Sequence, residues 1–266
     1  MRFITPLFRA TSVAAMVFVL AGTAHAQFLD EWVNYKWKDV PRTADGKVNL
    51  DAPTPKTADG KPDFSGFYMP RDFSKLINIA GNKPEDIPLL PAARALYQQR
   101  IDSNGKDHPG AYCLPSGIPE KLSIPDGLKV IQTPNVIVFL YESRTIYRQV
   151  FLDGRKLPKI DTDDFQPSWM GYSVGKWEGD TLVVETIGSN GKAWLDMKGL
   201  PGTEALHVTE RYTRPNMGIV NIDVTIDDPK AYSKPELQGD MEPPRRCRTH
   251  REHLRRKQQR RSTHGG

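Results

Sequence analysis

From Leu128 onward the chain is a succession of short β-prone segments that follow one another at intervals of about ten residues. Turn-forming residues separate these segments, and several of them alternate between apolar and polar side chains. The candidate strands are residues 136–142, 145–152, 171–176, 181–187, 206–212 and 220–226. This pattern predicts an all-β fold with minor α content, either an antiparallel, lipocalin-like β-barrel or a sandwich.

One short helix is expected in addition to the strands. Over residues 88–102, Leu89, Ala93, Leu96 and Tyr97 recur at helical spacing. A single helix among many strands is not typical of a doubly wound nucleotide-binding fold, which alternates strands with helices.

The first 26 residues have the three parts of a secretory signal peptide. Arg2 and Arg9 supply a positive start, residues 13–20 form an apolar stretch, and Ala24-His-Ala26 supplies small residues before a cleavage site at Gln27. The apolar stretch is too short to cross a membrane as a helix. We therefore expect a periplasmic or secreted protein without a membrane span, in a compartment where disulfides persist.

The rest of the chain is expected to form three parts. Residues 27–61 are an aromatic N-terminal arm and a turn-rich lead-in, which carries two copies of the turn-forming sequence Thr-Ala-Asp-Gly-Lys. Residues 62–235 are assigned to the β-barrel-like domain. Residues 236–266 form a basic tail.

The net charge of +5 comes from the ends of the chain. Nine of the 37 basic residues lie between Arg245 and Arg261 and two more lie in the first ten residues, whereas these segments hold one of the 32 acidic residues. The remainder of the chain is therefore net acidic. It gives no electrostatic reason to expect nucleic acid as a partner.

The motifs that the chain lacks exclude several kinds of chemistry. It has no dinucleotide-binding glycine motif after a strand, no phosphate-binding P-loop, no zinc-protease motif and no nucleophile elbow. Between the signal peptide and the tail, the only histidines and cysteines are His108, His207 and Cys113. Zinc sites are built mostly from these two residue types, so we expect neither a metal nor a cofactor.

Four charged residues lie among apolar neighbours on their strands. Because residues two apart on a strand point to the same face, Arg148, Glu185 and Glu210 each share a face with apolar side chains, and Glu142 ends such a face. A carboxylate in an apolar interior is costly unless it is paired or protonated. We predict a polar cluster inside the barrel that orients a ligand or transfers protons; structural ion pairing is the alternative.

Aromatic residues supply candidate walls for a pocket that takes a flat or sugar-like ligand. In a barrel, the alternative for each tryptophan is packing in the core or at the rim. A surface position is the alternative for the histidine of this set, which shares its strand face with Thr209 and Arg211. The candidate ligand-binding residues are Trp169, Tyr172, Trp177, Trp194, Asp196 and His207.

Several longer motifs resemble a family of exported, β-rich bacterial proteins, over roughly residues 41–235. The resemblance implies export and a β-rich fold and indicates no particular activity. The chain departs from the family pattern at Gly191, where aspartate is usual, and at Gly202, where histidine is usual. The motifs are Pro41-Arg-Thr-Ala-Asp-Gly-Lys, Pro62-Asp-Phe-Ser-Gly, Cys113-Leu-Pro-Ser-Gly, Ser173-Val-Gly-Lys-Trp-Glu-Gly-Asp-Thr-Leu-Val-Val-Glu-Thr, Trp194-Leu-Asp, Leu206-His-Val-Thr-Glu-Arg-Tyr and Thr225-Ile-Asp-Asp-Pro.

The sequence therefore favours an exported β-barrel protein that binds a small apolar or aromatic molecule, because it has neither a nucleophile motif nor a metal site. Two other functions stay open. One is a cofactor-independent lyase, isomerase or hydrolase that uses the interior carboxylates and Arg148. The other is a surface interaction protein with a solid core.

The basic tail is rich in arginine, glutamine and histidine and has no hydrophobic periodicity. Codons for residues 236–266 can be chosen so that a neighbouring reading frame encodes two strand-like stretches and an acidic end with a cysteine, as the resembling family continues. We therefore predict a frameshift near Glu236, a disordered tail without an evolved partner, and no dependable bridge between Cys113 and Cys247.

Sequencing of the gene tests the frameshift. We expect codons that encode the strand-like peptide in the neighbouring frame. Restoring that frame should raise both the melting temperature and the solubility, because two further strands would cover an exposed sheet edge. An intact frame whose codons cannot encode that peptide would contradict the prediction.

Overall fold

The structure is a computed structural model, and the described residues are 40–68, 77–81, 83–124, 127–234 and 237–241. The expected signal peptide, the aromatic arm up to residue 39 and residues 242–266 of the tail lie outside them. The chain divides into two units, residues 49–247 and the two ends, 1–48 with 248–266.

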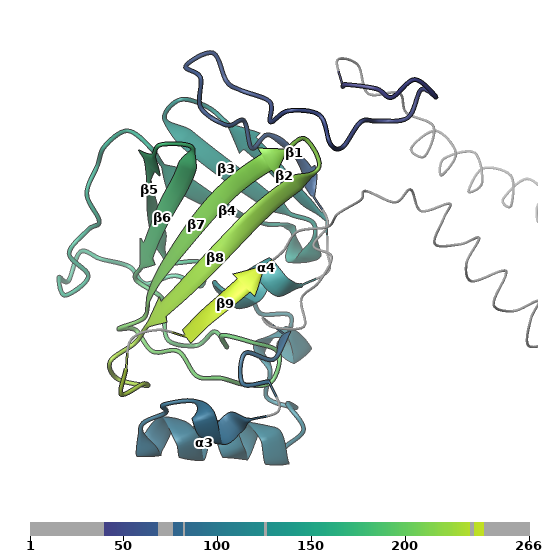
Figure 1. The fold of residues 1–266 in the computed structure, drawn as a ribbon. Coiled ribbons are helices and arrows are strands. Elements are labelled where there is room, and N and C mark those ends of the chain that lie inside the picture. The colour runs from purple at the N-terminus through teal and green to yellow at the C-terminus, as the bar shows by residue number, and fades with distance from the viewer. Residues whose placement is uncertain (1–39, 69–76, 82, 125–126, 235–236, 242–266) are drawn as a thin grey trace, which may run out of the picture. The chain divides into compact units, whose positions relative to one another are not determined.

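The larger unit contains one curled sheet of nine strands that has the form of half a barrel (Figure 1). Each strand pairs with the next along the chain, and no pairing within the described residues joins the last strand to the first. The predicted all-β class is confirmed, with an open sheet. The strands are β1 (Gly66–Tyr68), β2 (Leu128–Gln132), β3 (Val136–Tyr141), β4 (Ile146–Phe151), β5 (Tyr172–Glu178), β6 (Thr181–Ile187), β7 (His207–Asn216), β8 (Ile219–Asp227) and β9 (Leu237–Met241).

One strand pair differs from the antiparallel prediction. β4 and β5 are parallel, with Val150 opposite Ser173 and Phe151 opposite Val174. Parallel neighbours cannot be joined by a tight turn, and residues 152–171 make the long connection between them. The parallel pairing places Ser173 opposite Val150, and Arg148 lies two residues before Val150 on β4.

Helix α3 (Pro91–Asp102) confirms the predicted helix but begins three residues later than expected. Leu90 is extended because the residue before a proline is disfavoured in the helical region, and Pro91 fits the first helical position. A second helix, α4 (Glu120–Ser123), is a single buried turn that the sequence did not reveal. Within the described residues, no helix combines the length and the apolar character that a membrane span requires.

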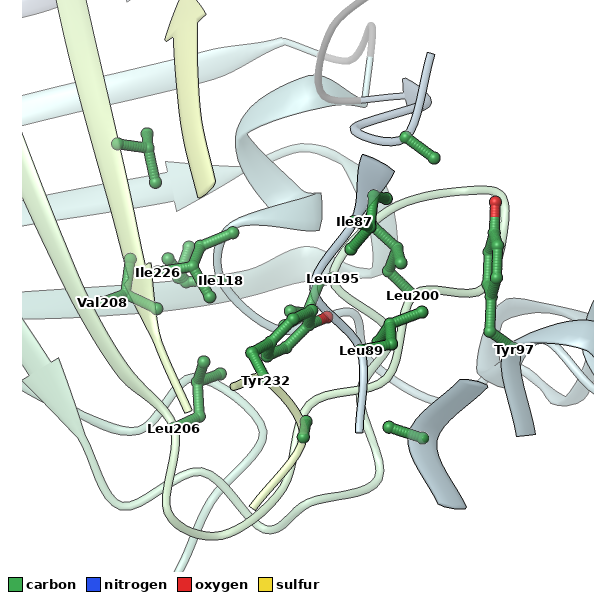
Figure 2. Packing of buried hydrophobic residues seen from close by; sticks show 14 of the residues in the cluster. Ile87, Leu89, Tyr97, Ile118, Leu195, Leu200, Leu206, Val208, Ile226 and Tyr232 are labelled. Carbon is green, nitrogen blue, oxygen red and sulfur yellow. The ribbon is translucent and has the colours of Figure 1, made fainter. Parts of the chain in front are cut away.

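Two apolar clusters form the core of the larger unit. In the first, side chains from α3, α4 and the connection between β6 and β7 pack against β7 and β8 (Figure 2). It includes Leu89, Tyr97, Ile118, Leu122, Leu195, Leu200, Leu206, Val208, Ile226 and Tyr232. The second cluster is richer in aromatic rings and consists of Phe64, Val130, Ile137, Phe139, Tyr141, Val150, Leu182, Val184, Tyr212 and Val220.

The structure confirms a turn that was predicted in the lead-in, and it differs from the prediction at the start of the tail. The turn predicted in the second Thr-Ala-Asp-Gly-Lys copy is present, closed by the backbone N–H of Thr57, which donates to the carbonyl of Lys61 at 2.8 Å. Residues 237–241, expected to lack structure, form β9 and pair with β8. The proposed frameshift stays a prediction.

Leu182→Ala should lower the free energy of unfolding by about 2–5 kcal/mol, because Leu182 is 1% exposed and the change leaves a cavity. Leu140→Ala is the matched control, since Leu140 is 40% exposed on β3, and its effect should stay within about 0.5 kcal/mol. Urea unfolding followed by circular dichroism measures both. Equal losses would contradict the assignment of inward and outward faces.

Candidate functional site

Arg148 and Glu210 meet inside the half-barrel, as the sequence predicted for these two residues. Arg148 lies on β4 and Glu210 on β7, and the curl of the sheet brings them together across β5 and β6. Nη1 of Arg148 donates to Oε1 of Glu210 at 2.9 Å, and Nη2 donates to Oε2. Both side chains are withdrawn from water, with residue exposures of 2% and 0%.

The two intervening strands satisfy the remaining donors of the arginine. Nε of Arg148 donates to the hydroxyl of Ser173 on β5 at 2.9 Å, and Nη2 donates to the hydroxyl of Thr186 on β6 at 2.6 Å. The hydroxyl of Tyr212 donates to Oε1 of Glu210 at 2.7 Å. We call these five residues the interior polar cluster. Its ion pair is hydrogen-bonded on both sides, as a buried pair must be if it is not to destabilise the fold.

Electrostatics keep the guanidinium of Arg148 charged. Burial by itself would lower the pKa of Arg148, but the adjacent Glu210 carboxylate outweighs burial and holds that pKa above its ordinary value. Burial, together with the same carboxylate, raises the pKa of Tyr212 well above its ordinary value. At neutral pH the cluster therefore holds a guanidinium and a protonated phenol.

One buried phenol lies beside the interior polar cluster, close enough to Arg148 for this guanidinium to act on its pKa. The hydroxyl of Tyr141, on β3, is buried and forms no hydrogen bond within the described residues. Its ring stacks with that of Phe139 at 6.5 Å between centroids, and Phe139 lies 5.9 Å from the ring of Tyr212. Burial raises the pKa of Tyr141 above its ordinary value, so the hydroxyl keeps its proton at neutral pH.

Glu185 does not belong to the interior, which corrects the prediction. On β6 the inward residues are Leu182, Val184 and Thr186, and Val184, not Glu185, lies opposite Glu210. Glu185 points to the other face, where its Oε1 is 3.8 Å from Nε2 of His207. Both side chains there are 35% exposed. Apolar residues occupy both faces of β6, so alternation alone could not decide which face is inward.

Glu142 also lies outside the interior polar cluster. On β3 the inward residues are Ile137, Phe139 and Tyr141, the opposite set from the one that the sequence suggested. Glu142 is exposed and precedes the turn that joins β3 to β4. As on β6, β-branched and leucine side chains on both faces hid the true alternation.

The predicted aromatic residues do not gather in one pocket. Trp177 stacks on Phe64 at 5.9 Å, whereas Tyr172 lies on the outer face of the sheet, 5.3 Å from the ring of Phe151. Trp194 is 2% exposed and belongs to the core, and Trp169 is half-buried in the connection between β4 and β5. The core and rim alternative therefore describes these residues better than a shared ligand wall.

Asp196 is a structural residue in the loop before β7. Its Oδ1 accepts hydrogen bonds from the backbone N–H groups of residues 198, 199 and 200, and its Oδ2 accepts one from Ile79. Burial raises the pKa of the Asp196 carboxyl, against the effect of these donors, which lower it. Both oxygens are therefore engaged with backbone N–H groups.

The structure reveals a second buried polar site that the sequence did not identify. Nε2 of His108 lies 2.7 Å from Oε1 of Glu120, which is fully buried at the start of α4. The other oxygen of Glu120 is buried and has no hydrogen-bond partner within the described residues. Arg144 lies nearby, with Nη1 3.3 Å from the hydroxyl of Ser116.

A sequence signal for this second site existed in the turn between β3 and β4. Arg144 and Thr145 both have positive φ, 59° and 50°, a conformation that glycine or asparagine normally supplies. A tight turn without either residue is strained, and this makes its side chains candidates for a functional role. Helix α4 gave no such signal, because a single turn is too short for periodicity to reveal.

Comparison of this chain with protein-family models, with curated proteins and with solved structures gives no match. The family resemblance therefore stays a prediction. Within the described parts of the chain, no group of three or more histidine, cysteine, aspartate or glutamate side chains could hold a metal ion.

Arg148→Met should lower the free energy of unfolding by about 3–5 kcal/mol, because it leaves the Glu210 carboxylate buried without its cation. The double change Arg148→Met with Glu210→Leu should recover most of this loss, since it removes both charges. Urea unfolding measures the three proteins. Arg155→Met, which breaks the exposed pair with Asp153, is the control and should have little effect. A double variant no more stable than Arg148→Met would contradict a purely structural ion pair.

Proposed function

We propose that this protein is exported and that it binds a small molecule with an aromatic or apolar body on the inner side of the half-barrel. The observation that carries the proposal is the buried hydroxyl of Tyr141, which has no hydrogen-bond partner within the described residues. An unpaired polar group in an apolar interior costs about 1–3 kcal/mol, so it calls for an explanation. A polar atom of a ligand would remove that cost.

The surroundings of Tyr141 fit a ligand with an aromatic body. Phe139 and Tyr212 present rings beside it, and the guanidinium carbon of Arg148 lies 5.8 Å from the ring centroid of Phe139. Aromatic rings attract flat ligands through offset and edge-to-face contacts. Because the Tyr141 hydroxyl stays protonated at neutral pH, it offers a donor. We infer a ligand that carries an acceptor such as a carbonyl oxygen.

The interior polar cluster supports binding better than catalysis. Both oxygens of Glu210 already accept hydrogen bonds from Arg148, and one of them accepts a further bond from Tyr212. A general base needs a lone pair within reach of the substrate proton. Glu185 and Glu142 lie outside the interior. These residues therefore do not form the group of interior carboxylates on which the enzyme hypothesis depended.

Export rests on the N-terminal pattern of charged, apolar and small residues, which lies outside the described residues. The periplasm or the extracellular space is therefore part of the proposal.

Tyr141→Phe tests the proposed site, with Tyr147→Phe as the control, since Tyr147 is 62% exposed on β4. Acetophenone, which has a carbonyl acceptor, and ethylbenzene, which lacks one, serve as probes in titrations followed by tryptophan fluorescence. Acetophenone should bind the wild type more tightly than ethylbenzene does. Tyr141→Phe should weaken acetophenone binding about tenfold, the effect of one hydrogen bond, without loss of thermal stability.

Equal binding of both probes, or equal binding to both variants, would contradict a site at Tyr141. Native mass spectrometry of freshly purified protein adds a readout that needs no assumption about the probe. We expect a co-purified small molecule that is lost from Tyr141→Phe and retained by Tyr147→Phe.

A further inference from the structure

The hydrogen bonds of His108 determine which of its two ring nitrogens donates and which accepts. The backbone N–H of Gly110 donates to Nδ1 at 3.0 Å, and since a backbone amide can only donate, Nδ1 must be the acceptor. Nε2 therefore carries the proton that His108 donates to Oε1 of Glu120 at 2.7 Å. The ring of Trp194 packs edge-on against the imidazole at 4.8 Å. The imidazole is a positioning group with no nitrogen left for a ligand.

Glu120 keeps one acceptor for which the described chain supplies no donor. Its Oε1 is engaged with His108, whereas its Oε2 is buried without a hydrogen bond in the described residues. The residue exposure of Glu120 is 0%, and the neighbouring hydroxyl of Ser123 donates to the backbone carbonyl of Glu120, not to its carboxylate. A fully buried carboxylate with an open oxygen calls for a donor that the described residues do not supply.

Arg144 is brought to the other edge of the same imidazole by a strained turn. A Cβ atom on Gly110 would touch Nη2 of Arg144 and would stand 2.7 Å from Nδ1 of His108, so the absence of a side chain at Gly110 lets the guanidinium approach. Positive φ at both Arg144 and Thr145 is costly for these residue types. The fold thus maintains an unfavourable turn conformation that holds this guanidinium beside His108.

We propose that Glu120 and Arg144, with His108 between them, bind a small carboxylic acid that carries a hydroxyl or amino group. The open oxygen of Glu120 accepts the hydrogen bond of the hydroxyl or amine. The guanidinium of Arg144 matches the geometry of the ligand carboxylate, which it can bind through two parallel hydrogen bonds. This site is distinct from the one at Tyr141, and either can exist without the other.

Isothermal titration calorimetry of the full mature chain tests the proposal with L-lactate, L-malate and L-serine as probes. Propionate is the matched control for lactate, because it keeps the carboxylate and lacks the hydroxyl. We expect at least one probe to bind, and lactate to bind more tightly than propionate. Failure of all three probes to bind the wild type would overturn the proposal.

Three variants locate the binding. Glu120→Gln should weaken binding at least tenfold, because it keeps an oxygen for His108 and turns the open acceptor into a donor. Glu142→Gln makes the same chemical change at an exposed residue near the turn and should leave affinity unchanged. Wild-type affinity in Glu120→Gln, or equal losses in both variants, would refute the assignment.

Arg144→Gly separates binding from folding. Glycine adopts the φ of 59° at this position without strain, so the melting temperature should stay the same or rise by about 2 °C. Binding of the carboxylate probe should nevertheless fall at least tenfold. Unchanged binding would show that Arg144 only shapes the turn, and a crystal structure with saturating probe in which Oε2 of Glu120 contacts water alone would also overturn the site.

Discussion

The buried ion pair between Arg148 and Glu210 is the constraint on which the arrangement of the sheet depends. Two charges withdrawn from water must be paired and fully hydrogen-bonded, or they destabilise the fold by several kcal/mol. The partners stand on β4 and β7, and the two strands between them supply the hydroxyls of Ser173 and Thr186. These four side chains can meet only if three features of the sheet are compatible. They are its curl, the parallel pairing of β4 with β5 and the register of β6 with β7.

The ion pair is fully hydrogen-bonded, so buried polar atoms elsewhere that lack a hydrogen bond need an explanation. Within the described residues, the buried side-chain atoms without a hydrogen bond are Oε2 of Glu120, the hydroxyl of Tyr141 and Nε2 of His207. The last still faces the carboxylate of Glu185 at 3.8 Å, so its environment is polar. The first two are a carboxylate oxygen and a phenol hydroxyl, and the phenol lies close enough to Arg148 for this guanidinium to oppose the rise of its pKa. The two proposed binding sites rest on these atoms, whereas the charged pair at the centre of the sheet has hydrogen-bond partners on both sides.

The second site also shows how local strain and long-range contacts combine. The turn between β3 and β4 carries Arg144 and Thr145 in a left-handed conformation, and the loop before α4 leaves room for the guanidinium at Gly110. The turn is unfavourable by itself, and neither segment alone shows that the two meet. Together with His108, which receives one hydrogen bond from its own loop and donates another to α4, they join three separate stretches of chain around one imidazole.

Local sequence determined the elements of this protein: the strands from residue 128 onward, the helix at 91–102 and the Asp-Gly turns, because each depends on neighbours along the chain. It also indicated that Arg148 and Glu210 would need partners inside. The inward faces of β3 and β6 escaped prediction, since apolar residues on both faces erase the alternation, and Glu142 and Glu185 were placed wrongly as a result. The meeting of Glu120, His108 and Arg144 was decided by tertiary structure alone, because only packing brings α4, its preceding loop and the β3–β4 turn together.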